Sequence, residues 1–545
     1  MSNNSNLHLT LRARDIPAAG TLRDLIRFTA RRYEDKPAFV IPRDNGTDEE
    51  KSFRAFSDDI DALGTVLFRQ GLRGCRVAIL GGNSYEWLLS YFAAANGGNT
   101  AVPLDRDLPA GELAFLLEDS GCAALVCAPE YEDMLPALQD AAGLRRTIRM
   151  EEIAAMLAEG RRLIAQGDDS YTGCALGADS LAAIVYTSGT TGKPKGVMLT
   201  QGNITADALA VGRRVQGAGR VVQALPLHHT FGLTAGVLIP LMYCTTNYLS
   251  RSVRNVQKDI VKTKATVLIL VPAIIEVVYQ KIWESARKKG EEDKLRKALK
   301  LSRALMRLGI DVRRRLFREV LDALGGELYL LICGGAPLNE RITADFLAMG
   351  VNLLNGYGIT ECSPVVSVNP NRKNRVGSVG PPVDCCRVRI DEGGEIQVKG
   401  SNVMQGYYGD GQATRDAFTG DGWFKTGDLG TLDRRGYLYV TGRIKHLIIL
   451  SNGKNVSPEE LEEKLKLLPG VVEAAVYGED GRIAAEIYAD PAASASEING
   501  AVHAMNRGLP GYKQVGLVKL RDTPFPKTTT MKIKKHSIQG GTRHD

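Results

Sequence analysis

The chain has 545 residues, of which 44% are hydrophobic and 24% are charged; this length exceeds one ordinary core, so two or more domains are expected. A formal net charge of +7, spread over so long a chain, does not indicate a nucleic-acid partner. Nine scattered cysteines form no metal-ligand pair, and the first residues show no signal region, so we predict reduced thiols and a cytoplasmic protein.

Strands and helices alternate through the first part of the chain. Residues 76–80, 99–103 and 123–127 have the character of short strands, with helical segments between them. The same alternation resumes after residue 200, with strands expected at 221–225 and 265–271. Alternation of this kind predicts parallel α/β sheets that are covered by helices on both faces.

Residues 187–196 read TSGTTGKPKG and follow an apolar strand at 181–186. Glycines let backbone N–H groups approach phosphate oxygens, hydroxyls donate further hydrogen bonds, and lysines offset the charge. The spacing differs from a Walker loop, because only two residues separate Gly189 from Gly192 and Pro194 follows Lys193. A phosphate-binding loop and an ordinary surface loop both fit this composition.

Two further segments have features that also occur in membrane-crossing or membrane-contacting helices. The most apolar stretch, residues 224–244, approaches membrane-crossing length but contains His228, His229 and two prolines, so we interpret it as buried core. Residues 281–323 form a charge-dense helical pair with one apolar stripe. Packing of that stripe on the core is the favoured interpretation, and contact with a membrane surface is the alternative.

The last third of the chain changes character twice. Short alternating strands with hairpin turns fill residues 376–440 and predict a small β unit. After about residue 442, a capping box at 457–460 and two strands at 471–479 and 482–490 predict a compact α+β domain.

The order of residues 186–196 resembles the phosphate-loop signature of the adenylate-forming superfamily, and in particular its fatty acyl-CoA synthetase-like AMP-binding enzymes. Further segments resemble that family's motifs in the same order along nearly the whole chain. They are 225–229 for the acyl pocket, 356–361 for adenine, 426–428 for ribose, 442–445 for the hinge and 526–532 for the C-terminal lysine.

This resemblance implies an α/β fold with a large N-terminal domain and a small mobile α+β C-terminal domain. The large domain would hold two α/β sheet subdomains and a small β-barrel. The implied boundaries are 1–442 for the AMP-binding adenylation domain, about 365–441 for its β-rich subdomain, and 443–545 for the lid, with the hinge near Lys445.

The resemblance also implies roles for individual residues, with Glu361 as the Mg²⁺ ligand because a carboxylate suits that ion. The implied catalytic residues are Lys532, Thr190, Glu361 and His229. The implied ATP- or AMP-binding residues are Thr187, Ser188, Gly189, Thr191, Gly192, Lys193, Gly334, Gly335, Ala336, Pro337, Asn355, Gly356, Tyr357, Gly358, Thr360, Asp428 and Arg443. Ser451, Asn452 and Gly453 would line the CoA channel.

Taken singly, these residues have ordinary structural interpretations. Tyr357 can stack on adenine but would also suit a core, and Asp428 can bind ribose hydroxyls but would also suit a turn. Lys532 lies in a basic run that could be a solvated tail. The chain also departs from the family, with His446 where an acidic residue is common and Met531 where glycine usually precedes the lysine.

The implied reaction is attack of a carboxylate on ATP to give an acyl-adenylate, followed by transfer to the thiol of CoA. Residues 225–240 contain no acidic side chain, which disfavours an ammonium-bearing acid. The charged helical segment before Gly334 resembles that of long- and medium-chain fatty acyl-CoA synthetases, and this resemblance implies a medium- or long-chain fatty acid as the substrate. An acyl carrier protein as acceptor, or an aryl acid as substrate, remains an alternative. A catalytically silent lipid- or membrane-binding protein is the alternative from a different class.

Overall fold

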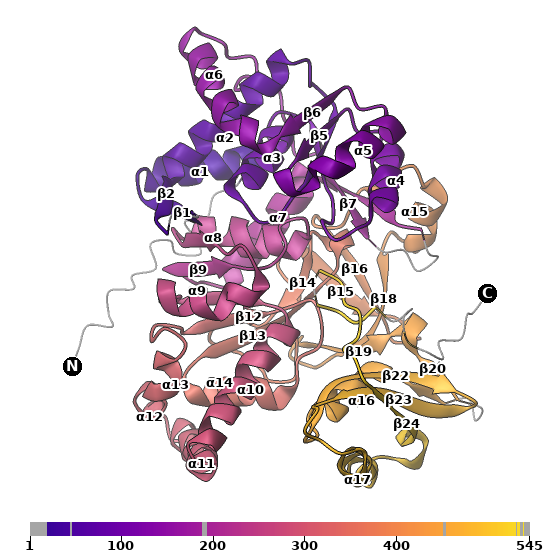
Figure 1. Cartoon of the computed structure of the whole chain (residues 1–545). Helices are drawn as coiled ribbons and strands as arrows, with labels where there is room; N and C mark the ends of the chain where they lie inside the picture. Colours follow the sequence, from indigo (N-terminus) through magenta and orange to yellow (C-terminus); the bar gives the residue numbers. More distant parts are fainter. Residues whose placement is uncertain are drawn as a thin grey trace.

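The computed structural model describes residues 19–43, 46–187, 193–450, 454–529, 531–534 and 538. Within them, two large sheets form the core of the N-terminal part, and Figure 1 shows one above the other. The upper, seven-stranded sheet runs in the order β17 (Gly406–Tyr407), β8 (Lys195–Thr200), β7 (Leu181–Thr187), β4 (Thr100–Pro103), β3 (Arg76–Leu80), β5 (Ala124–Cys127) and β6 (Arg146–Arg149).

The second sheet has eight strands and collects segments that are far apart in the sequence. Its order is β14 (Val365–Val368), β13 (Asn352–Gly358), β12 (Leu330–Cys333), β11 (Val267–Leu270), β9 (Arg220–Gln223), β10 (Thr246–Leu249), β1 (Pro37–Pro42) and β2 (Asp48–Ser52). Most neighbouring pairs are parallel, and only the edge strands β14 and β2 pair antiparallel. The predicted pair of α/β sheets is therefore confirmed.

Helices cover both sheets, as the alternation predicted. They are α1 (Leu22–Tyr33), α2 (Phe53–Arg69), α3 (Tyr85–Ala95), α4 (Ala110–Ser120), α5 (Leu135–Ala142), α6 (Ile153–Ala165), α7 (Gln201–Arg214), α8 (Ile239–Met242), α9 (Val256–Thr263), α10 (Pro272–Lys288), α11 (Glu292–Arg307), α12 (Arg313–Leu316), α13 (Arg318–Asp322), α14 (Glu340–Met349) and α15 (Gly411–Ala417). None of the described helices has both the length and the apolar character needed to cross a bilayer.

The apolar stretch at 224–244 is buried, as expected, but it is not a plain α-helix. A π-helix occupies Phe231–Leu238 and leads into α8. Two glycines allow it to pack closely, since a Cβ on Gly232 would lie 2.1 Å from the Pro226 carbonyl oxygen and one on Gly236 would lie 2.3 Å from Gln223 Oε1. This close packing fixes the loop that carries His228 and His229.

The β-rich part is a four-stranded antiparallel sheet in the order β15 (Cys386–Ile390), β16 (Glu395–Gly400), β18 (Phe424–Leu432) and β19 (Leu438–Arg443). It is tied to the large sheets, because β14 and β17 come from the same stretch of chain yet pair with β13 and β8. Asn203 of α7 adds to the tie by donating hydrogen bonds to the carbonyls of Ser401 and Val403, at 2.8 and 2.9 Å.

The C-terminal part has its own core. Its sheet has the order β22 (Val471–Glu479), β23 (Arg482–Ala489) and β24 (Val515–Arg521), and its other elements are β20 (Ile448–Ile449), β21 (Asn455–Val456), α16 (Pro458–Leu465) and α17 (Ala495–Asn506). Figure 1 shows it in yellow beside α10 and below β19. An ion pair of 3.7 Å between Lys466 and Glu276 of α10 links it to the large domain.

Candidate active site

The two segments expected to bind adenine lie at the same edge of the eight-stranded sheet. Strands β12 and β13 are parallel neighbours, with Cys333 opposite Asn355, so residues 334–337, which follow β12, begin beside residues 356–358, the last residues of β13. Gly335 has φ +90°, which favours glycine, and a Cβ on Gly358 would lie 1.9 Å from the Pro364 carbonyl oxygen. The carboxyl edge of parallel strands is where α/β sheets bind ligands.

A hydrogen-bonded group stands beside this edge. The Tyr357 hydroxyl donates to Asp428 Oδ2 at 2.7 Å, and Arg443 Nε donates to Asp428 Oδ1 at 2.7 Å. Burial and the Asp428 carboxylate raise the pKa of Tyr357 well above its usual range, so the phenol keeps its proton. Asp428 lies opposite Arg443 in the register of β18 and β19, and this pairing brings the carboxylate and the guanidinium group together.

Glu361 lies just beyond β13, in a short 3₁₀ turn that also holds Thr360. Burial raises the pKa of Glu361, while the Tyr407 hydroxyl donates to its Oε1 at 3.0 Å. The same tyrosine ring lies 4.9 Å from Lys195 Nζ, at the start of β8. Tyr407 thus joins the Glu361 carboxylate to the strand that follows the predicted phosphate loop.

Sequence reasoning did not single out Tyr407. It lies in the two-residue strand β17, and a strand that short produces no alternation of apolar and polar residues. Part of the predicted site lies outside the described residues, namely Ser188, Gly189, Thr190, Thr191 and Gly192 of the loop and Ser451, Asn452 and Gly453 of the predicted CoA channel. The loop's flanks are described: Thr187 ends β7 opposite Lys195, and Lys193 is exposed.

Lys532 lies where the C-terminal part contacts the large domain, near Asp428 and Arg443. The turn that carries it is closed by hydrogen bonds from Thr528 N to the Lys532 carbonyl, at 2.8 Å, and from Lys532 N to Thr528 Oγ1, at 3.2 Å. Lys532 keeps contact with solvent, but the protein around it lowers its pKa through desolvation, with Arg443 lowering it further and Asp428 opposing. The lysine is therefore exposed yet within electrostatic reach of Asp428 and Arg443, and it does not lie in a tail remote from the large domain.

His229 is brought to the same place. Burial lowers the pKa of His229 to about 3, and the positive charge of Lys532 contributes to this decrease. The backbone N–H of Phe231 donates to His229 Nδ1 at 3.2 Å, so the single imidazole proton is on Nε2. His229 is thus a neutral hydrogen-bond donor beside a cationic lysine.

The neighbouring His228 makes a contact between the domains that the sequence did not predict. Its Nε2 lies 3.3 Å from Thr529 Oγ1 and 3.5 Å from Asp105 Oδ1. The Thr529 hydroxyl in turn donates to Asp105 Oδ2 at 3.1 Å. Since that hydroxyl has one proton, the proton between His228 and Thr529 comes from the histidine. These three residues come from positions far apart in the chain, and no local pattern connects them.

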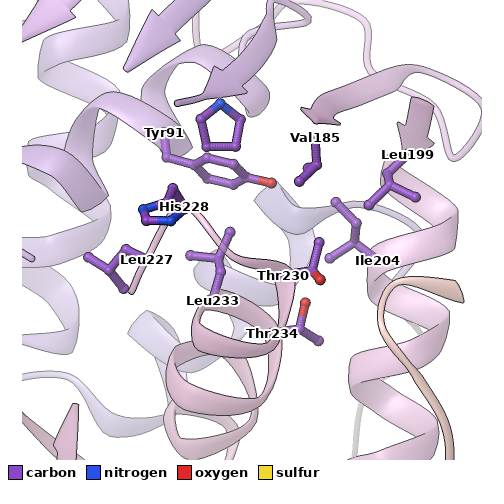
Figure 2. A pocket seen from close by; sticks show the side chains of 10 residues that line it. Tyr91, Val185, Leu199, Ile204, Leu227, His228, Thr230, Leu233 and Thr234 are labelled. Carbon is purple, nitrogen blue, oxygen red and sulfur yellow. The ribbon is translucent and has the colours of Figure 1, made fainter. Parts of the chain in front are cut away.

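An apolar cavity lies next to the histidines. Figure 2 shows it between Tyr91 and His228 at one end and Thr230 and Thr234 at the other. Its lining is Tyr91, Pro103, Val185, Leu199, Ile204, Leu227, His228, Thr230, Leu233 and Thr234. The free space admits little more than a water molecule, so a larger group requires side-chain movement. Burial lowers the pKa of His228, so the lining is uncharged near neutral pH.

The predicted magnesium ligand has the chemistry that the ion needs. The Glu361 carboxylate accepts a hydrogen bond from Tyr407 at Oε1, and a carboxylate is a ligand that a hard cation prefers. Among the described residues, His, Cys, Asp and Glu form no group of three that could enclose a metal ion. Mg²⁺ at Glu361 would therefore take its other ligands from phosphate oxygens and water, as it commonly does with nucleotides.

The carboxyl edge of β12 and β13, the apolar cavity and Lys532 of the C-terminal part are the features that a ligand-binding site here would combine. The chain belongs to the AMP-binding enzyme family, whose sequence model matches residues 26–408. The resemblance of the motifs, the fold class and the predicted class of AMP-binding, acid-activating enzyme are thereby confirmed.

Individual relatives agree with this assignment. The chain is 31% identical over 505 residues to long-chain-fatty-acid–CoA ligase FadD15 of Mycobacterium bovis, covering 86% of this chain and 83% of the relative. It is 30% identical over 531 residues to feruloyl-CoA synthase of an Amycolatopsis species, covering 93% and 97%. The crystal structure of ATP-bound MatB from Rhodopseudomonas palustris superposes with a TM-score of 0.75 at 27% identity, covering 94% and 97%.

Proposed function

We propose that this chain is an ATP-dependent ligase that joins a medium- or long-chain fatty acid to the thiol of CoA through an acyl-adenylate. The observation that carries the proposal is that Lys532 lies within electrostatic reach of His229, whose neighbour His228 lines the uncharged cavity. A carboxylate whose acyl chain enters that cavity would lie between the two nitrogen groups. ATP held at the edge of β12 and β13 would present its α-phosphate from the opposite side.

The residues around the nucleotide edge then have distinct roles. Tyr357 and residues 334–337 would hold adenine, while Asp428 would accept hydrogen bonds from the ribose hydroxyls. Glu361 would hold Mg²⁺, which, when bound, neutralises phosphate charge. Residues 188–192 would bind the terminal phosphates through backbone N–H groups.

Lys532 would act in the first half-reaction. Negative charge builds on the α-phosphate oxygens as the carboxylate attacks, so a cation placed there stabilises the transition state more than the ground state. His229 would donate from Nε2 to the carboxylate and orient it. The tautomer fixed by Phe231 suits that role, since a neutral donor does not neutralise the nucleophile.

The second half-reaction requires a different arrangement. The thiol of CoA would have to attack the same carbonyl from another side, once pyrophosphate has gone. We infer a swing of residues 443–545 about Lys445, which would withdraw Lys532 and bring residues 451–453 to line the pantetheine channel. The large domain, residues 1–442, would keep the acyl-adenylate in place during the swing.

The cavity supports an uncharged acyl group as the substrate. Its lining has no ionised side chain to pair with an ammonium or a second carboxylate, and burying an unpaired charge is costly. The FadD15 relative is named for long-chain fatty acids, which agrees with this reading.

An aryl acid with a polar ring substituent is the second candidate. The Thr230 hydroxyl oxygen has no hydrogen-bond partner among the described residues, although it is buried beside the cavity. A phenol or methoxy group on the substrate could supply that partner. The feruloyl-CoA synthase relative is named for such an acid.

The test is pyrophosphate release with a panel of saturated and aryl acids, measured with and without CoA. The proposal predicts acid-dependent pyrophosphate release without CoA, and acyl-CoA as the product when CoA is present. Preference for aryl over saturated acids would support the second candidate. If the acyl group is then transferred to a carrier protein but not to CoA, the acceptor is the carrier protein and not CoA.

A further inference from the structure

The exposed apolar side chains of the large domain are concentrated on one short segment. Leu301 is 52% exposed, Leu308 is 72% exposed and Ile310 is 47% exposed, all on α11 or the turn that follows it. Met306 and Leu316 nearby are each 38% exposed. Exposed large apolar residues scattered singly are ordinary, but five within sixteen positions are a patch.

This apolar face is distinct from the one that packs on the core. Leu295, Leu299 and Ser302 are buried, and the Ser302 hydroxyl donates to the Ala348 carbonyl at 2.7 Å. At 3.6 residues per turn, Leu301 and Leu308 project from the opposite side of the helix. The sequence predicted a single core-facing stripe that included Leu308; this is wrong at Leu308, which is exposed and belongs to a second, outward stripe.

Unpaired positive charges border the outward stripe. Lys297, Lys300 and Arg307 lie beside Leu301 and Leu308 on the helix, and none of them forms an ion pair with a described residue. The paired bases of α11 engage carboxylates instead, as Arg296 does with Glu292 and Arg303 with Asp345.

The charge of this segment stands out against the whole chain. Residues 281–318 contain fourteen Lys and Arg against five Asp and Glu, a surplus of nine, whereas the complete chain has a net charge of +7. The rest of the protein is therefore slightly acidic. A positive field is concentrated where apolar side chains face solvent, at the bottom of the large domain in Figure 1.

We propose that the outward face of α11, defined by Lys297, Lys300, Leu301, Arg307 and Leu308, docks on an anionic phospholipid bilayer. The leucines would enter the boundary between headgroups and acyl chains, while the long basic side chains would extend to lipid phosphates. A nucleic acid or an acidic protein would also attract the charges. Neither would require the two exposed leucines, so the combination favours a lipid surface.

Sedimentation of the full-length protein with vesicles tests this proposal. Phosphatidylcholine vesicles that contain phosphatidylglycerol should bind the protein, and pure phosphatidylcholine vesicles should bind it much less. The triple variant Lys297→Gln, Lys300→Gln, Arg307→Gln should partition about a hundredfold more weakly, because each basic residue near an anionic surface contributes a factor of about five. The double variant Leu301→Ser, Leu308→Ser should lose at least about tenfold.

Matched variants on other surfaces provide the controls. Lys425→Gln, Arg434→Gln, Arg435→Gln removes three exposed charges from the β-rich sheet, and Leu517→Ser, Leu520→Ser removes two exposed leucines from β24. Both should bind vesicles like the unaltered protein. All four variants should keep their unfolding temperature and their pyrophosphate release with a freely soluble acid, so the outcome is separate from that of the proposed function.

Three results would overturn the proposal. The unaltered protein could fail to sediment with anionic vesicles, or the control charge variant could lose binding as severely as the α11 variant. The third result has two parts. The leucine variant would bind vesicles like the unaltered protein, and heparin would bind the unaltered protein but not the charge variant. That result would assign the face to a polyanion.

Discussion

The hydroxyl of Thr529 donates a hydrogen bond to Asp105 Oδ2 at 3.1 Å, across 424 residues of sequence and across the boundary between the two domains. His228 joins the pair through Nε2, at 3.3 Å from the threonine. Thr529 precedes Lys532 by three positions, so this contact holds the turn that carries the lysine. The contact between Thr529 and Asp105 would form only while Lys532 lies beside the carboxyl edge of β12 and β13.

Thr529→Val should therefore slow adenylate formation about tenfold, because it removes hydrogen bonds to a carboxylate and an imidazole. Formation of the thioester from supplied acyl-adenylate should remain unchanged, since the turn is withdrawn in that step. Single-turnover measurements of the two half-reactions check this. Thr529→Ser keeps the hydroxyl and should behave like the unaltered enzyme; equal slowing of both half-reactions by the valine variant would contradict the role.

Lys532→Ala should reduce adenylate formation by about two to three orders of magnitude and spare thioester formation. The pH dependence should also be distinctive. Desolvation and Arg443 lower the pKa of Lys532 from 10.5, so its charge is lost as pH rises through a value below that of an ordinary lysine. Adenylate formation should decline over that alkaline range. Lys532→Arg should abolish this decline, and its persistence would point to another titrating group.

Met531 replaces the family's glycine, and its backbone explains why glycine is common there. Its φ is +63°, in the left-handed region, which costs most residues about 1–2 kcal/mol. Its side chain compensates by packing against the core of the large domain. Met531→Ala should lose this contact and keep the strain, so adenylate formation should slow.

Met531→Gly should be faster than the alanine variant by about five- to thirtyfold, because it loses the contact but relieves the strain. Rates of pyrophosphate release for the two variants provide the comparison. An alanine variant that is as fast as the glycine variant would show that strain at this position does not affect the reaction.

Glu463 of α16 makes docking of the C-terminal domain sensitive to pH. Burial raises the pKa of Glu463 from 4.5 to about 7. The positive charge of Lys466 opposes this increase. The negative charges of Glu276 and Glu340, from the large domain, and of Glu462 add to the increase. A carboxyl whose pKa is higher in the docked state takes up a proton on docking. Docking should thus be strongest below about pH 4.5 and weaken as pH rises to about 7.

Fluorescence energy transfer between dyes on the two domains would measure this change. Glu463→Gln is neutral at every pH, so its docking should be independent of pH across the same interval. A glutamine variant that keeps the pH dependence of the unaltered protein would assign the titration to a different pair of groups.

Tyr91 should control the size of the acid. Its ring is buried, stacks on Trp87 at a centroid distance of 5.7 Å and occupies one end of the cavity. Tyr91→Ala should raise the ratio of kcat/KM for longer acids to that for shorter acids about tenfold, provided circular dichroism shows a folded protein. Tyr91→Phe keeps the ring and should leave this ratio unchanged. An unaltered ratio in the alanine variant would place the acyl chain elsewhere.

Much of the fold could be predicted because strand and helix periods are local. Strands such as β7 and β9 begin within a residue of their predicted positions, since short apolar runs between polar turns mark buried strands. The π-helix at Phe231–Leu238 could not be predicted, because it depends on two glycines meeting Pro226 and Gln223 through tertiary packing.

The residues of the candidate site also divide into those that the sequence could predict and those that it could not. Asp428, Tyr357 and Lys532 lie in recognisable motifs, and the structure brings them near one another. Tyr407 and Asp105 have no motif, because each acts through a partner that is distant in sequence and its position is set by strand pairing. The roles of residues 188–192 and 451–453 stay predictions.

Strand β17 has a consequence for how this enzyme could be rebuilt. It pairs with β8 and supplies Tyr407 to Glu361, so a segment that follows the four-stranded sheet's first hairpin completes the N-terminal sheet. A hybrid enzyme joined near residue 365 would combine β8 from one parent with β17 from another, and the strand pair beside Glu361 would be mismatched. A graft made near residue 443 would exchange the C-terminal module alone.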